Sequence, residues 1–63
     1  MKITADQLKP GDHVWCVDSE YREVGQVKPC LIDGESHIAF TVRGVKFTMF
    51  CFAHVELYIL FDR

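Results

Sequence analysis

The sequence predicts a single all-β domain, a small five-stranded barrel with a short helical turn near its N-terminus, and three observations predict it. Apolar and polar residues alternate with a period of two along residues 37–43, as in a half-buried strand. Turn signals recur roughly every 8 to 12 residues, for example at Asp33-Gly34 and Arg43-Gly44, which is the spacing of sandwiches and barrels. The 63 residues suffice for one domain, residues 1–63, but not for a two-layer sandwich. Closing a short sheet into a barrel also removes its exposed edges.

The first elements are a helical turn and a strand. Residues 4–8 fit one helical turn, because Thr4 can cap it and Gln7, three residues later, completes a capping box. Pro10-Gly11 ends this turn. Residues 13–17 are rich in strand formers and give the first strand.

A long, bent second strand is expected over residues 22–32. Gly25 lies where the alternation slips, which is typical of a bulge. Pro29 cannot donate a ladder hydrogen bond and should lie at an edge or a kink. Asp33-Gly34 then predicts a tight hairpin turn into the third strand.

The remaining alternations predict two more strands. Beyond Arg43-Gly44, every second residue from Val45 to Cys51 should point inward, and a final strand should follow His54 over residues 55–61. The predicted core comprises Val14, Val24, Val27, Ile38, Phe40, Val42, Val45, Phe47, Leu57 and Ile59.

Composition and charge narrow the function classes. Seven basic and nine acidic residues give a net charge of −2, which is not that of a polybasic nucleic-acid binder. The longest apolar runs have five residues, far below the roughly 20 that span a bilayer. Because the apolar region of a secretory signal peptide is also missing, we expect a cytoplasmic protein that does not enter membranes.

Metal binding and catalysis are not expected. His13-x-x-Cys16 and Cys51-x-x-His54 supply two histidines and two cysteines at mirrored spacings, but residues three apart on a strand point to opposite faces, which disfavours a zinc site. The three cysteines form no framework and are expected to be free thiols. No phosphate loop, nucleophile elbow or zinc-protease motif occurs. The sequence therefore predicts a protein that is not an enzyme and has no cofactor.

The opening residues carry a family resemblance. Leu8-Lys9-Pro10-Gly11-Asp12-His13-Val14 resembles the L-x-P-G-D-x-V start of small SH3-like β-barrel proteins of bacteria and their phages, particularly phages of actinobacteria. Val55-Glu56-Leu57 resembles their closing strand. The resemblance implies an SH3-like barrel and a phage-encoded protein, but its motifs specify fold rather than function. The peptide-binding signature of eukaryotic SH3 domains is absent.

An excess of apolar residues on the outward parity is the main functional signal. Trp15, Phe52, Tyr58 and Leu60 are expected to form an exposed patch, which on a small soluble protein usually marks a binding surface. A bulge that switches parity at Phe50 and Phe52 would instead place these two in the core. Both interpretations remain open from the sequence.

The sequence thus favours a non-catalytic protein-interaction module that binds a host or viral protein. Self-association as a homodimer through the same patch is favoured over a monomer, since small domains often gain stability by oligomerising. The alternative is a nucleic-acid-binding barrel, because Arg43 and Lys46 flank one hairpin tip. Nearby acidic residues oppose phosphate binding there.

Overall fold

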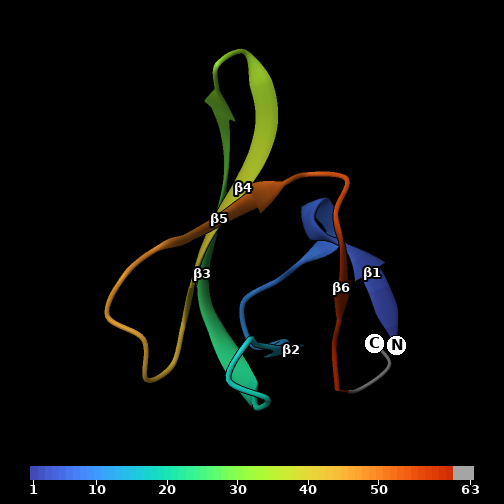
Figure 1. The fold of residues 1–63 in the computed structure, drawn as a ribbon, viewed down its shortest axis with the longest axis vertical. Helices are drawn as coiled ribbons and strands as arrows, with labels where there is room; N and C mark the ends of the chain where they lie inside the picture. The colour runs from blue at the N-terminus through green and yellow to red at the C-terminus, as the bar shows by residue number, and fades with distance from the viewer. Residues whose placement is uncertain (61–63) are drawn as a thin grey trace.

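The computed structural model describes residues 1–60, and these form an all-β fold with one short 3-10 helix. The strands make two antiparallel sheets, one of four strands in the order β2-β3-β4-β5 and one of β1 and β6 (Figure 1). The all-β prediction is confirmed, but residues 1–60 contain six strands rather than five. The elements are β1 (Lys2–Thr4), η1 (Ala5–Gln7), β2 (His13–Trp15), β3 (Tyr21–Ile32), β4 (Glu35–Val42), β5 (Met49–Phe52) and β6 (Glu56–Tyr58).

The two sheets meet where β2 passes the end of β6. Val14 forms an isolated antiparallel bridge with Ile59, and the N–H of Leu60 donates to the C=O of His13 at 2.9 Å. No bridge joins β1 to β5 within the described part of the chain. The strand pairing therefore shows two connected sheets, and closure into an SH3-like barrel stays a prediction.

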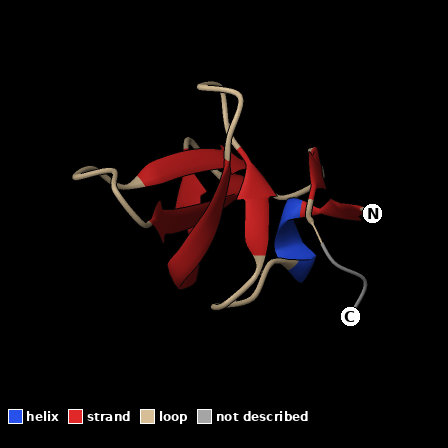
Figure 2. Cartoon of the chain, turned by 90° about the horizontal axis from the view of Figure 1, so that it is seen from below, coloured by secondary structure: helices blue, strands red, loops and turns tan. Residues whose placement is uncertain are grey.

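The N-terminal turn forms where the capping pattern predicts it. The N–H of Thr4 donates to Oε1 of Gln7 at 3.2 Å, and the Thr4 hydroxyl donates to the Asp6 carboxylate. The N–H of Ala5 reaches the C=O of Val55 at 2.8 Å, which fastens η1 to the segment before β6. Figure 2 shows η1 on the side of the molecule that carries the N-terminus. No helix in residues 1–60 is long and apolar enough to span a bilayer.

The bend in β3 is a bulge at Gly25, as the slipped alternation predicts. The register to β4 shifts between Val24 and Val27. The N–H of Gln26, displaced from the ladder, donates to Oγ1 of Thr41 at 3.0 Å. A Cβ on Gly25 would lie 2.9 Å from that oxygen, so glycine lets the two strands approach closely enough for this bond.

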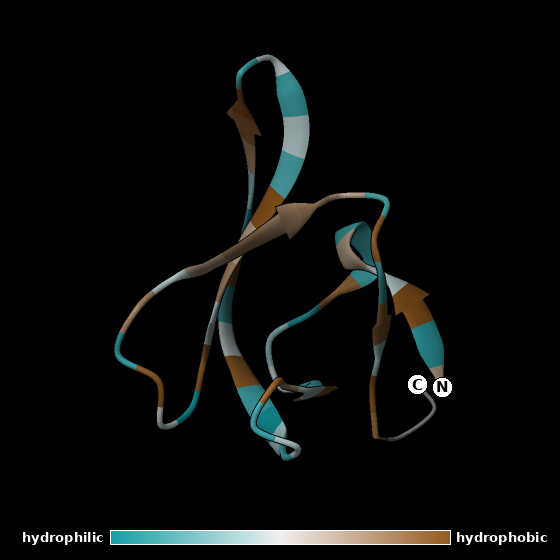
Figure 3. Ribbon diagram, viewed as in Figure 1, coloured by the Kyte–Doolittle hydropathy of each residue, from teal (hydrophilic) through white to brown (hydrophobic). Residues whose placement is uncertain are grey.

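The β3–β4 hairpin has the predicted two-residue turn. Asp33 and Gly34 have φ angles of 51° and 77°, the left-handed conformation of a type I′ turn. Pro29 lies opposite Ile38 on a stretch of β3 whose other side has no strand partner in residues 1–60, so the predicted edge position is confirmed. The hairpin tip projects beyond β5 (Figure 1), and its apolar β3 end is brown in Figure 3.

The core lies between the two sheets and contains most of the predicted residues. Val27, Val45 and Leu57 are half-buried against it. Ile3 and Leu8 join the core although neither is in the predicted set, because β1 and the segment after η1 cover one side of it. The buried residues are Ile3, Ala5, Leu8, Val14, Cys16, Val24, Ile38, Phe40, Val42 and Ile59.

The prediction for Phe47 is wrong. This side chain is 67% exposed, because residues 43–48 form a loop and not the start of a strand. Gly44, with φ of 85°, turns the chain away from β4, and strand geometry resumes only at Met49. From there the expected parity returns, with Met49 and Cys51 half-buried against the core. The predicted end of the last strand, at Phe61, lies outside the described residues.

Candidate functional site

Three of the four residues predicted to form a patch lie together on one outer face. Because Val14 lies opposite Ile59 in antiparallel pairing, Trp15 lies opposite Tyr58, and the residue before Val14 lies opposite Leu60. Opposite residues project from the same face of a sheet. Trp15, Tyr58 and Leu60 are each 45–54% exposed. β2 and β6 thus bring residues 43 positions apart in the sequence into one surface.

Tyr21 extends this surface, and sequence reasoning missed it. Tyr21 pairs with Trp15 across β2 and β3, and the two rings meet edge to face with centroids 5.0 Å apart. Because Tyr21 follows the polar run Asp18-Ser19-Glu20, the sequence indicates that it lies in a loop. Only the pairing of β3 with β2 shows that Tyr21 is a strand residue beside Trp15. At the other end, Nζ of Lys2 lies 6.0 Å from the centroid of the Tyr58 ring. We call Tyr21, Trp15, Tyr58 and Leu60 the outer patch.

The outer patch stands on a filled core. Val14 and Ile59, on the opposite face of the same strands, are each only 2% exposed. An aromatic side chain cannot turn inward without displacing them, because side chains alternate strictly along a strand. The outer patch is therefore exposed by the geometry of the sheet rather than by mobility of a loop.

Phe52 is exposed as predicted but belongs to a different surface. It lies on β5 opposite His37 of β4, with ring centroids 4.4 Å apart, and its ring stacks on His54 at 5.4 Å. Phe50, on the same face of β5, is also exposed. Both phenylalanines are thus surface residues, and the interpretation that a bulge buries them is wrong.

A cluster of charges organises the loop beside Tyr21. Oδ2 of Asp18 accepts hydrogen bonds from Nε and Nη2 of Arg22, and Glu20 lies 3.3 Å from the same guanidinium. Nη1 of Arg22 donates to the C=O of Arg43 at 3.0 Å, which ties this loop to the turn after β4. The hydrogen bond from Arg22 holds the pKa of Asp18 below its usual value. Arg22 therefore fixes two loops at the Tyr21 end of the outer patch.

The residues of the nucleic-acid alternative do not form a cationic groove. Arg43 is exposed and makes an ion pair with Glu23 at 3.8 Å. Lys46 is exposed on the loop before β5. Two cations, one of them beside a carboxylate, offer a phosphate backbone little attraction.

The four residues considered for a zinc site contact different neighbours and do not form one cluster. His13 lies on the outer face of β2 opposite Glu23, whereas His54 stacks on the ring of Phe52. Burial raises the pKa of the Cys16 thiol and, on β5, that of Cys51, so neither is an activated thiolate. No group of three or more His, Cys, Asp or Glu side chains suited to a metal ion occurs in residues 1–60.

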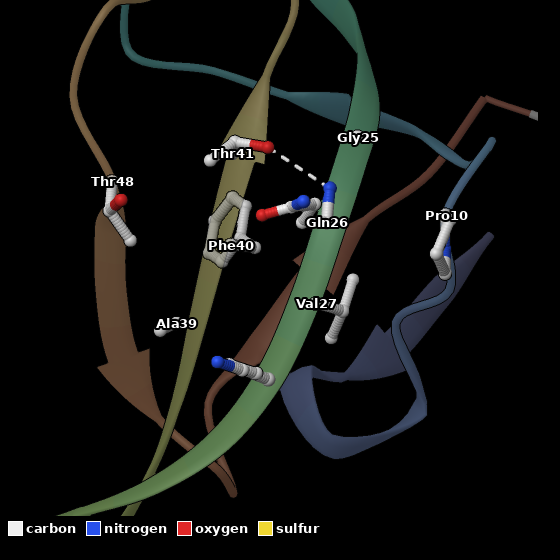
Figure 4. A pocket seen from close by; sticks show the side chains of 9 residues that line it. Pro10, Gly25, Gln26, Val27, Ala39, Phe40, Thr41 and Thr48 are labelled. Carbon is white, nitrogen blue, oxygen red and sulfur yellow. Dashed lines mark hydrogen bonds between the residues drawn. The ribbon is translucent and has the colours of Figure 1, made fainter.

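An open depression of about 500 Å³ lies beside the β3 bulge (Figure 4). The hydrogen bond from the Gln26 N–H to Oγ1 of Thr41 joins two of its lining residues, and Lys28 supplies the one charge in its lining. No carboxylate, histidine or cysteine lines it, so Lys28 has no second titratable side chain beside it in the lining and no thiol nucleophile is present there. The lining residues are Pro10, Gly25, Gln26, Val27, Lys28, Ala39, Phe40, Thr41 and Thr48.

No protein-family model, no curated protein and no solved structure matches this chain significantly.

Proposed function

We propose that the protein is a non-catalytic protein-interaction module whose docking surface is the outer patch. The observation that carries this proposal is the convergence of Tyr21, Trp15, Tyr58 and Leu60, all 38–54% exposed, on β2, β3, β6 and the residues directly after β6, above a filled core. Contiguous apolar surface of this kind on a small domain marks a contact site.

The chemistry of the outer patch suits a protein partner. Tryptophan and tyrosine are the residues most enriched at the energetic centres of protein interfaces, because they bury a large area and keep a polar group at the rim. Lys2 at one end and Glu23 at the other supply charges at the periphery, as in the polar rim of an interface. The resemblance to phage barrel proteins extends the proposal to a host or viral protein met in the cytoplasm.

Affinity capture tests this function. The immobilised wild type should retain a partner from lysate, and Trp15→Ala with Tyr58→Ala should weaken that binding by at least roughly 30-fold, the effect of losing one or two interface hot spots. Phe47→Ala is the control, because Phe47 is an aromatic outside the outer patch that is even more exposed than Trp15 and Tyr58. Circular dichroism verifies that each variant is folded. Equal loss of binding in the control, or full binding by the double variant, would contradict the proposal.

Nucleic acid is the competing partner and needs a separate measurement. A mobility shift with bulk DNA and RNA at low ionic strength should show no complex, because the chain carries a net charge of −2 and Arg43 is already paired with Glu23. A salt-sensitive complex that Arg43→Ala with Lys46→Ala abolishes would favour the nucleic-acid function instead.

A further inference from the structure

The depression beside the β3 bulge is hollowed over the central strand β4, which lies between β3 and β5. Ala39 and Thr41 line it and are half-buried, on the face of β4 opposite the core side chains. Ala39 lies opposite Lys28 of β3 on one side and opposite Phe50 of β5 on the other. Because cross-strand neighbours project from the same face, two large side chains flank a small one. The hollow therefore follows from the strand pairing of Ala39.

The polar side chains around this depression can all donate hydrogen bonds. Oγ1 of Thr41 accepts from the N–H of Gln26, so the Thr41 hydroxyl proton is available to a ligand. Figure 4 shows Thr41 between Gln26 of β3 and Thr48, the residue directly before β5. Thr48 adds a hydroxyl and Gln26 a side-chain amide to the lining. With the ammonium group of Lys28, four donating side chains surround the same hollow.

The charge of Lys28 has no counterpart in the fold. Lys2, Arg22 and Arg43 each have a carboxylate within 4 Å, whereas Lys28 makes no ion pair within the part of the chain that the structure describes. No carboxylate lines the depression either. A cation beside neutral donors favours an anionic ligand, because hydrogen bonds to a charged acceptor are the strongest. One ammonium group matches a single negative charge, as a carboxylate carries.

We propose that this depression binds a small aromatic carboxylate. The carboxylate would accept hydrogen bonds from Lys28 and from the hydroxyls of Thr41 and Thr48, and the ring would lie on Ala39. The ring of Phe50, which is 58% exposed, offers an aromatic contact at the side of the hollow. The volume of about 500 Å³ falls within the range of about 300–1,000 Å³ typical of small-molecule sites.

This site is separate from the proposed docking function. The outer patch lies on β2, β6 and the first residue of β3, whereas the depression lies over β4 and the middle of β3. A ligand in the depression would leave Trp15 and Tyr58 open to a partner protein. Failure of either proposal therefore leaves the other standing.

A titration of the nitrogen-labelled full chain with sodium naphthoate, followed by two-dimensional NMR, tests the site. Amide signals of residues 26–28, 39–41 and 48–50 should shift saturably, with a Kd of about 1 mM or below, as expected for a ligand of this size. Naphthamide has the same ring without the charge and should bind at least about 10-fold more weakly. Absence of saturable shifts, shifts centred on Trp15 and Tyr58, or equal binding of naphthamide would overturn the proposal.

Variants with matched charge assign the ligand to these side chains. Lys28→Gln should weaken naphthoate binding at least about 10-fold, and Thr48→Val about 5-fold through loss of its hydroxyl. Lys2→Gln is the control, because it removes the same charge from β1 in the other sheet and should leave the Kd unchanged. Circular dichroism verifies that each variant is folded. Equal weakening in Lys2→Gln, or full binding by Lys28→Gln, would show that the depression is not the site.

Discussion

Two phenylalanines with the same sequence pattern should respond in opposite ways to truncation. Phe40 lies on β4 between β3 and β5 and is 6% exposed, so Phe40→Ala leaves a cavity and should cost about 3–5 kcal/mol. A domain of 63 residues has a total stability of only about 3–9 kcal/mol, at roughly 0.05–0.15 kcal/mol per residue. Phe47 is 67% exposed, so only about a third of its transfer free energy is at stake, roughly 0.5–1 kcal/mol.

Urea unfolding followed by Trp15 fluorescence and by far-ultraviolet circular dichroism measures both effects. Phe40→Ala should lose a large part of the total stability, so its urea midpoint should fall far below that of the wild type, whereas Phe47→Ala should unfold cooperatively with a midpoint close to that of the wild type. Agreement between the two probes verifies two-state unfolding, on which the comparison depends. If Phe47→Ala lost as much stability as Phe40→Ala, the assignment of residues 43–48 to an exposed loop would be refuted.

Further predictions concern the turns, the bulge and acid stability. Gly44→Ala should destabilise the fold by about 1–3 kcal/mol and by more than Gly34→Ala, since both have positive φ but only the first would place a Cβ 2.5 Å from Arg22. Thr41→Val should cost about 1 kcal/mol in thermal unfolding and Thr41→Ser much less, because the serine hydroxyl still accepts from the bulge amide. Because the pKa of Asp18 is lowered in the fold, its stabilising effect is present above about pH 4 and lost as pH falls through the folded value. Asp18→Asn should therefore be less stable than wild type at neutral pH and equal to it in strong acid, and equal melting at pH 7 would disprove this.

Features that depend only on residues close together in the sequence could be predicted. Asp33-Gly34 encodes its turn through two residues that tolerate positive φ, and Gly25 marks the bulge because no side chain fits against Thr41. Strand β1 could not be found in this way, because Lys2–Thr4 is a strand only through its pairing with β6, more than 50 residues later. Phe47 shows the opposite failure. The alternation of apolar and polar residues continues through residues 43–48, but these residues form a loop, so the alternation does not tell which side chains are buried.

For the candidate site, too, exposure could be predicted from the sequence, whereas the grouping of residues on one face could not. Parity along each strand predicts which apolar residues face outward, and Trp15, Phe52, Tyr58 and Leu60 are all exposed. Parity cannot predict which of them share a face, because that depends on strand order. The bridge from β2 to the end of β6 unites three of them, whereas Phe52 lies on the far strand of the four-stranded sheet. Tyr21 could be added only after its pairing with Trp15 was visible.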